Sequence, residues 1–300
     1  MKKLLIIDHP RHNWLEHFDG LQLESGEDIV VDQANIHKIN LSATSRDGIK
    51  LELMPEEQPI ANSQQSEYRK FVPDMVLIKK ISRNILFGFM YSNIPAINSL
   101  ESLYMNLERA IVFGGLIEIN KRLGNDEFPL IDQYYYQDHY QMDKSPEFPI
   151  VTKIGSAHSG FGKMKIESRQ RFQDFASVMA LYKDYVTSEP FIPVEYDFRI
   201  QKIGTSYRGL KRISTNWKAN TGSYMLEEIP VSDKHKKWVD ECSELFGGMD
   251  ILALDALRTK DGDEYIIELN DCRIGFPEEF KQEDMKDVCK STISKMNSIF

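Results

Sequence analysis

The chain has 300 residues, of which 41% are hydrophobic and 28% are charged, so it can bury a sizeable core. Its 37 basic and 46 acidic residues give a formal net charge of −9, which argues against a general nucleic-acid binder that neutralises phosphates. No apolar run approaches the roughly 20 residues of a membrane-spanning helix, and three cysteines are too few for a disulfide framework. We therefore expect a protein of the reducing cytosol without a transmembrane segment.

The first third of the chain alternates short apolar strands with helical patterns, which predicts a parallel sheet with helices on its faces. The candidate elements are strands at 2–8, 27–33 and 73–78, an amphipathic helix around 85–90, and a polar loop or linker at 55–68. After Asn98 the pattern of apolar residues changes to a long run at helical spacing. We therefore predict an N-terminal α/β domain over residues 1–98 and a second domain over residues 99–300.

The second part has the pattern of an α+β domain with much antiparallel strand. Apolar residues at helical spacing predict one helix over 99–123, with Gly124 as its C-terminal cap. The candidate elements that follow are strands at 149–154 and 164–167, a helix at 168–181, and extended runs at 185–192, 196–203 and 207–213.

A glycine-rich segment between two of these strands, from Lys153 to Lys163, is the first candidate binding site. Its three glycines let backbone N–H groups approach an anion, and a lysine at each end adds positive charge. The spacing matches neither a Walker loop nor a dinucleotide fingerprint, because Gly162 is followed by a strand-like run rather than a helix. The segment is either a phosphate-binding loop between two strands or an ordinary hairpin with surface lysines.

The second candidate is an acidic hairpin. A turn around residues 261–262 would place Asp255 and Glu268 near each other on paired strands, and Glu268 and Asn270 share one face of their strand. Two carboxylates and an amide oxygen beside a phosphate loop suit Mg²⁺. The alternative is a hairpin with an exposed acidic face, although these polar residues interrupt very apolar runs.

A third group of residues could complete a nucleotide site. Residues 189–192 could supply an acceptor and an apolar wall for a base. Arg199, Arg212, Lys218 and Asn220 would supply the donors that a triphosphate and an anionic acceptor need, and they are our candidates for a catalytic role. Each is individually typical of a solvated surface group.

In this order, the features resemble the ATP-grasp fold, in which two lobes clamp ATP, and within it the central folded domain of the synapsins. The resemblance runs nearly end to end, and its most specific parts are the glycine-rich loop and the Asn216–Ser223 segment. The other segments that carry it are residues 5–10, 97–100, 127–133, 189–192, 201–204 and 246–251. It implies a pre-ATP-grasp domain followed by a two-lobed ATP-grasp domain. The flanking synapsin regions are not in this sequence, so we expect the folded domain alone or a short family member.

The resemblance implies a set of ATP-binding residues, and Glu189 and Ile192 would meet the adenine. The full set is Arg109, Lys153, His158, Ser159, Gly160, Phe161, Gly162, Lys163, Glu189, Phe191 and Ile192. Arg109 stands where the family has a lysine, which keeps the charge but not the shape. Asp255, Glu268 and Asn270 would hold the metal. Asp255 stands where the synapsins have a glutamate. An asparagine at the position of Asn270 is typical of the ligases of the ATP-grasp superfamily.

Two functions follow as hypotheses. The first is a synapsin-like ATP-binding regulator that forms a homodimer or homotetramer and associates with the cytosolic face of synaptic vesicles, where it regulates vesicle clustering and neurotransmitter release. Its effectors would be ATP and Mg²⁺, with Ca²⁺ as the alternative metal. The second is an ATP-dependent carboxylate–amine or carboxylate–thiol ligase that acts through an acyl-phosphate. The sequence identifies no acceptor substrate, so it does not decide whether the protein is an enzyme.

Overall fold

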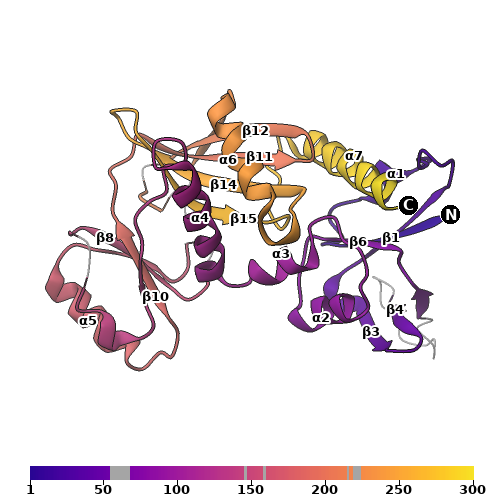
Figure 1. Ribbon diagram of the computed structural model, residues 1–300, viewed down its shortest axis with the longest axis horizontal. Coiled ribbons are helices and arrows are strands. Elements are labelled where there is room, and N and C mark those ends of the chain that lie inside the picture. Colours follow the sequence, from indigo (N-terminus) through magenta and orange to yellow (C-terminus); the bar gives the residue numbers. More distant parts are fainter. Residues whose placement is uncertain (55–67, 145–146, 158–159, 215, 219–223) are drawn as a thin grey trace.

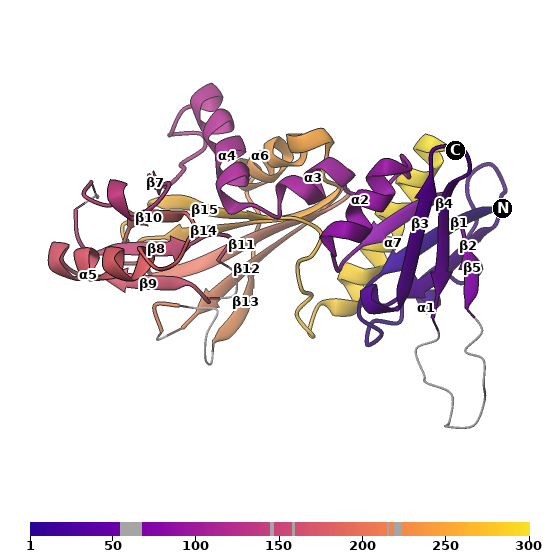
Figure 2. The same cartoon turned by 90° about the horizontal axis from the view of Figure 1, so that it is seen from below.

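The computed structural model describes residues 1–54, 68–144, 147–157, 160–214, 216–218 and 224–300. Three parts lie in a row: an N-terminal α/β part, a large antiparallel sheet, and a small four-stranded lobe at the far end (Figures 1 and 2). This arrangement confirms the predicted fold class, an α/β domain followed by a two-lobed domain. Among the described residues, no helix is both long enough and apolar enough to cross a membrane.

The N-terminal part is built on a three-stranded parallel sheet. Its central strand β1 (Lys2–Ile7) pairs with β2 (Ile29–Ala34) on one side and with β6 (Met75–Ile78) on the other. Helix α1 (Leu15–Phe18) follows β1, and α2 (Arg83–Tyr91) follows β6. The parallel sheet that the alternation of strands and helices predicts is therefore present.

A second, antiparallel sheet in this part is one that the sequence analysis does not predict. It consists of β3 (Ile39–Thr44), β4 (Gly48–Leu53) and β5 (Arg69–Phe71). Gly88 of α2 lets Leu41 of β3 approach closely, because a Cβ at Gly88 would lie 2.3 Å from a Leu41 methyl carbon. This close contact fixes α2 against the antiparallel sheet.

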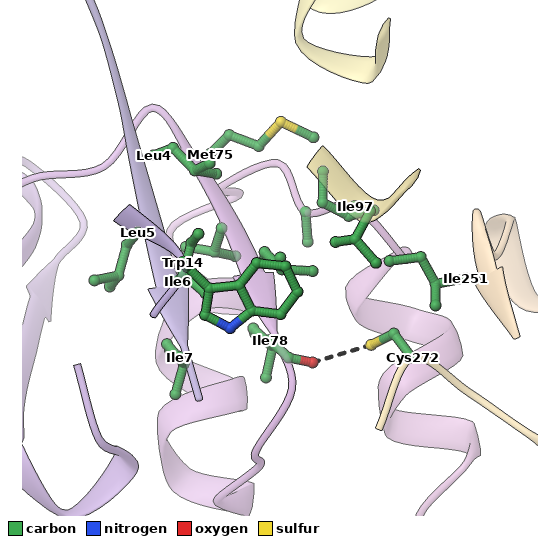
Figure 3. Close-up of a cluster of buried hydrophobic side chains, with 14 of the residues drawn as sticks. Leu4, Leu5, Ile6, Ile7, Trp14, Met75, Ile78, Ile97, Ile251 and Cys272 are labelled. Atoms are coloured by element: carbon green, nitrogen blue, oxygen red, sulfur yellow. Dashed lines mark hydrogen bonds between the residues drawn. The ribbon is translucent and has the colours of Figure 1, made fainter. Parts of the chain in front are cut away.

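The core of the N-terminal part draws on both ends of the chain. Trp14 lies beside buried side chains of β1 and β6 (Figure 3). Its Nε1 donates to Asp8 at 2.8 Å. Cys272 comes from the far end of the chain, and its Sγ lies 3.0 Å from the Ile78 carbonyl. The last helix, α7 (Lys281–Ile299), buries its apolar side chains in the same core. The N-terminal part is therefore completed by C-terminal residues.

The single helix expected over 99–123 is two helices, α3 (Leu100–Met105) and α4 (Arg109–Leu123). Asn106 ends α3, because its side-chain amide donates to the Ser102 carbonyl and competes with the helical backbone. The residue before α4 is extended, which turns the new helix. Gly124 ends α4 at φ 84°, so the predicted glycine cap is confirmed.

The small lobe is an antiparallel sheet covered by α5 (Arg169–Met179). In spatial order, its strands are β7 (Tyr134–Tyr136), β10 (Val186–Pro190), β8 (Ile150–Ile154) and β9 (Lys163–Ile166). Phe172 and Phe175 of α5 are buried against this sheet. The lobe thus presents β8 and β9, and the loop between them, toward the large sheet.

The large sheet is antiparallel, and α4 and α6 (Asp233–Ser243) cover one of its faces (Figures 1 and 2). In spatial order, its strands are β13 (Met225–Ile229), β12 (Ser206–Ile213), β11 (Tyr196–Ile203), β14 (Ile251–Arg258) and β15 (Glu264–Asn270). Short 3₁₀ helices occur at Ile36–Lys38, His139–Gln141 and Leu245–Gly247. Trp238 of α6 is fully buried, and its Nε1 donates to the Glu127 carbonyl at 2.7 Å.

Candidate functional site

Strand β8 carries Lys153 into the space between the small lobe and the large sheet. Lys153 pairs with Thr187 of β10 on one side and with Lys163 of β9 on the other. Its Nζ lies 2.6 Å from the Glu189 carboxylate, and only 3% of its side chain is exposed. Burial lowers the pKa of Lys153 to about 8, against the opposing attraction of Glu189. A buried ammonium of this kind gains more from an anionic ligand than an exposed one does, because water screens it less.

The loop after β8 turns directly into β9, as the glycine-rich segment predicts. Gly155, Gly160 and Gly162 have φ values of 50°, 81° and 66°, a region that residues with a Cβ rarely adopt. The Ile154 amide donates to the Gly162 carbonyl at 2.9 Å and closes the turn. The sequence therefore needs glycine at these positions for the loop to reverse between two adjacent strands.

The other residues of this loop that were predicted to bind ATP differ from one another in their exposure and contacts. Phe161 is 78% exposed, and the Gly160 carbonyl accepts a hydrogen bond from Lys218 Nζ at 3.2 Å. His158, Ser159 and the catalytic candidate Asn220 lie outside the described residues. The Lys218 contact joins the loop of the small lobe to the segment after β12.

A cavity of about 450 Å³ opens between the two lobes, and it collects most of the predicted site. The predicted residues that line it are Lys153, Gly160, Lys163, Glu189, Phe191, Ile192, Arg212, Lys218, Asp255 and Glu268. Arg109, Arg199 and Asn270 instead line a neighbouring cavity. Phe161 and Gly162 line neither of these two cavities. The residues chosen from three separate stretches of sequence are thus brought to one place.

Aromatic side chains at the mouth of the cavity are contacts that the sequence analysis misses. The rings of Phe191 and Trp217 lie 6.3 Å apart, edge to face. Lys165 holds its Nζ 4.0 Å above the Phe191 ring. Trp217 lies in the Asn216–Ser223 segment and directly before the candidate Lys218, and this position is the signal in the sequence that could have indicated its contact.

The acidic hairpin forms as predicted, and its first carboxylate is closely paired. Asp255 of β14 lies directly opposite Glu268 of β15. Arg199 donates from Nε and from one terminal nitrogen to the two Asp255 oxygens, at 2.8 and 2.9 Å. Asn270 Nδ2 donates to Asp255 at 3.1 Å. Burial acts to raise the pKa of Asp255, but Arg199 and Arg212 lower it to about 2, so the side chain is ionised.

The second carboxylate, Glu268, connects the two lobes and the start of α4. One of its oxygens lies 2.5 Å from a terminal nitrogen of Arg109, and the other lies 3.4 Å from Lys163 Nζ. Burial acts to raise the pKa of Glu268, but Arg109 and Lys163 lower it. Glu268 lines both cavities, so the Arg109–Glu268 pair forms part of the wall between them.

The donor set of the hairpin can be compared with what a divalent metal requires. Within the described ranges, no three His, Cys, Asp or Glu side chains gather closely enough to hold a metal ion by themselves. Two adjacent carboxylates and an amide side chain are of the ligand types that Mg²⁺ takes together with phosphate oxygens and water. In this structure both Asp255 oxygens accept from Arg199 and one Glu268 oxygen accepts from Arg109, so a metal would have to displace these arginine contacts. Asp255, Glu268 and Asn270 would be its protein ligands.

The three cysteines are buried, and none of them lines either cavity. Burial raises the pKa of each thiol, to about 11 for Cys289 and further for Cys242 and Cys272. The thiolate, which is the reactive form, is therefore disfavoured.

Two lobes that close over one charged cavity define the ATP-grasp class of folds, and solved structures of that class resemble this chain. The ligase PsnB in complex with a phosphomimetic minimal precursor, Mg and ADP has a TM-score of 0.63 at 14% identity, with 99% of both chains covered. The VanG D-Ala:D-Ser ligase from Enterococcus faecalis has a TM-score of 0.62 at 10% identity, with 98% of both chains covered. A RimK-domain ATP-grasp protein from Sphaerobacter thermophilus has a TM-score of 0.62 at 14% identity, with 98% of this chain and 99% of the other covered. These similarities show the fold.

The sequence comparisons identify the family. Residues 1–96 match the synapsin pre-ATP-grasp domain, and residues 98–298 match the synapsin ATP-binding domain. The chain therefore belongs to the synapsin family. It is 33% identical over 309 residues to a synapsin of Drosophila melanogaster, with 99% of this chain covered but only 30% of that relative. The chain thus spans less than a third of that relative's length.

Proposed function

We propose that the cavity between the lobes binds ATP and that the protein is a synapsin-like, ATP-regulated protein. The observation that carries the proposal is the convergence of Lys153, Lys163 and Glu189 on one cavity beside Phe191 and Ile192. The lysines would contact the phosphates. The end of β10 and the residues that follow it would hold the adenine, with Glu189 as acceptor and Ile192 as an apolar wall. Family membership supports this assignment.

A divalent metal would act with the nucleotide. Mg²⁺ would bridge phosphate oxygens and neutralise part of their charge, and Ca²⁺ is the alternative. Asp255, Glu268 and Asn270 would hold the ion. Arg199, Arg212 and Lys218, three of the four catalytic candidates, would then balance the remaining negative charge of the phosphates.

The biological role that we propose follows from the family. The protein would associate peripherally with the cytosolic face of synaptic vesicles as a homodimer or homotetramer, and it would regulate vesicle clustering and neurotransmitter release. ATP and the metal would be effectors of this role. The proposed division into domains at residues 1–98 and 99–300 follows the change in the pattern of apolar residues after Asn98.

Thermal unfolding with and without Mg·ATP tests the binding site. A ligand that binds only the native state stabilises it by about 2.7 kcal/mol at a hundredfold excess over Kd. At roughly 2 °C per kcal/mol for a chain of this size, we expect a rise in Tm of about 5 °C. No shift at millimolar nucleotide would disprove ATP binding.

The proposed vesicle role needs a separate measurement. Co-flotation with purified synaptic vesicles, with and without ATP, should show protein in the vesicle fraction. Light scattering on the eluted protein should give a dimer or tetramer mass. Absence from the vesicle fraction in both conditions would refute the vesicle role without touching ATP binding.

The ligase hypothesis is the second candidate. This hypothesis is favoured by the presence of Asn270 beside Asp255 and Glu268, because an asparagine at this position is typical of the ligases of the ATP-grasp superfamily. Release of ADP in the presence of a panel of carboxylates and amines would support it. ADP release that no acceptor stimulates would exclude those acceptors and favour the regulator.

A further inference from the structure

A further cavity, of about 780 Å³, lies at the end of the large sheet where β11 turns into β12 beside α7 (Figure 1). Its walls come from this turn, from residues 243–250 between α6 and β14, and from α7. None of its lining residues lines either of the two cavities at the lobe junction. Its volume is within the range of small-molecule sites, which is about 300–1,000 Å³, so it can be considered as a separate binding site.

The charged side chains of this cavity balance one another. Lys295 Nζ lies 2.9 Å from the Asp250 carboxylate, and Lys290 Nζ lies 3.3 Å from the Asp287 carboxylate. Equal numbers of basic and acidic residues line the cavity: Lys202, Lys290 and Lys295 against Glu244, Asp250 and Asp287. A lining without net charge gives no overall attraction to an anion or to a cation, which favours an uncharged ligand.

The paired lysines still have N–H groups for a ligand. A lysine ammonium has three N–H donors. Among the described residues, Lys295 uses one of them for Asp250, and Lys202 uses two, for Asp240 at 2.7 Å and Ser243 at 3.1 Å. About a third of the Lys295 and Asp250 side chains is exposed. This pair therefore presents a charged donor and a charged acceptor side by side in the cavity.

Hydroxyl groups provide much of the remaining lining. Thr205 and Ser206 come from the β11–β12 turn, and Ser291, Ser294 and Ser298 come from α7. Only 8% of Ser291 is exposed, and within the described ranges its hydroxyl has no hydrogen-bond partner although it lines the cavity. The Ser291 hydroxyl can therefore gain a hydrogen bond from a ligand that reaches it.

The lining offers little to an apolar ligand. In the described part of the chain, its hydrophobic residues are Ile203 and Met249, which are 3% and 2% exposed. Small-molecule sites are usually lined by hydrophobic and aromatic side chains, so this cavity differs from them. An apolar molecule would also remove the lysines and acids from water without replacing their hydrogen bonds. A molecule with several hydroxyl groups would replace them.

We propose that this cavity binds a small uncharged polyol, such as a cyclitol or a sugar. A hydroxyl both donates and accepts, so one hydroxyl would accept from Lys295 while the hydroxyl on the next ring carbon donates to Asp250. Ser291 and Ser294 would contact further hydroxyls. The cavity shares no lining residue with the nucleotide site, so this proposal is independent of the proposed function.

Ligand-observed NMR titration of the full chain with myo-inositol tests the proposal. Thermal melting is unsuitable, because excluded polyols stabilise proteins without binding them. We expect saturable binding of myo-inositol that saturating ATP does not displace. Cyclohexanol, which has the same ring with a single hydroxyl, should bind at least tenfold more weakly. Myo-inositol 1-phosphate should gain nothing from its charge at this cavity.

Lys295→Met should weaken myo-inositol about tenfold, because a hydrogen bond to a charged group is lost, and should leave ATP affinity unchanged. Lys286→Met is the matched control, since Lys286 is an exposed lysine of the same helix that lines none of the three cavities. It should leave both affinities unchanged.

Ser294→Leu provides a second route if Lys295→Met does not fold. It adds bulk at an exposed helix position and keeps every ion pair, so it should also weaken myo-inositol. No saturable binding at tens of millimolar, equal binding of cyclohexanol, displacement by ATP, or unchanged affinity in both variants would each overturn the proposal. Tighter binding of myo-inositol 1-phosphate that Lys295→Met removes would also overturn it, because the cavity would then be an anion site.

Discussion

The pKa of Lys153 leads to a sharp prediction about nucleotide affinity. Burial lowers that pKa to about 8, and the ammonium is the form that attracts phosphate. The contribution of Lys153 to ATP affinity should therefore be constant below pH 7 and fall as the pH rises through about 8. With bound nucleotide keeping the ammonium protonated, the protonation equilibrium gives a loss of about twofold at pH 8 and about tenfold at pH 9.

The assay is calorimetric titration with ATP at pH 7, 8 and 9. The charge of the triphosphate changes little over this range, because a phosphate group loses its last proton near pH 6. Lys153→Met removes the titrating group and fills a similar volume. We expect this variant to bind ATP more weakly at pH 7 and to show no further loss up to pH 9. A flat profile for the native protein, or the same slope in both proteins, would refute the role of Lys153.

Three further substitutions test the acidic hairpin. Glu268→Gln should abolish the enhancement of ATP affinity by Mg²⁺. Asn270→Ala should reduce this enhancement less, because water can replace a neutral ligand. Titrations with ATP in EDTA, Mg²⁺ and Ca²⁺ measure both effects, and tight binding with Ca²⁺ alone would contradict the choice of metal. Asp255→Asn tests the pKa of about 2 of the Asp255 carboxyl, whose ordinary pKa is 3.8. The difference between the two pKa values means that ionised Asp255 stabilises the fold by about 2 kcal/mol above pH 4. Because this contribution is lost as the pH falls toward 2, urea unfolding should show a larger loss on acidification for the native protein than for Asp255→Asn.

The local parts of the site are the parts that could be predicted from sequence. The glycine-rich loop and the acidic hairpin each depend on residues within about twenty positions, where strand periodicity and turn residues determine the geometry. Lys153, Asp255 and Glu268 were chosen on those grounds and line one cavity. Gly124 was likewise predictable, because a helix that ends in a left-handed residue favours glycine.

The long-range pairings could not be predicted in this way. Arg109 meets Glu268 across 159 positions, and Arg199 meets Asp255 across 56. Nothing in the periodicity of either segment encodes its partner, because an arginine on a strand or at the start of a helix is usually solvated. The packing of α7 into the N-terminal core was missed for the same reason.

The buried charges at the lobe junction are themselves an argument for a ligand. Lys153, Glu189 and Asp255 are nearly removed from solvent, and Glu268 is partly buried. Burying an ion pair costs desolvation that its own attraction only offsets, so apolar residues would make an equally stable junction. Stability alone therefore gives no reason for this junction to be ionic. Binding of a polyanion gives such a reason, because a fixed set of charges in a water-poor cavity needs no reorganisation when the polyanion enters.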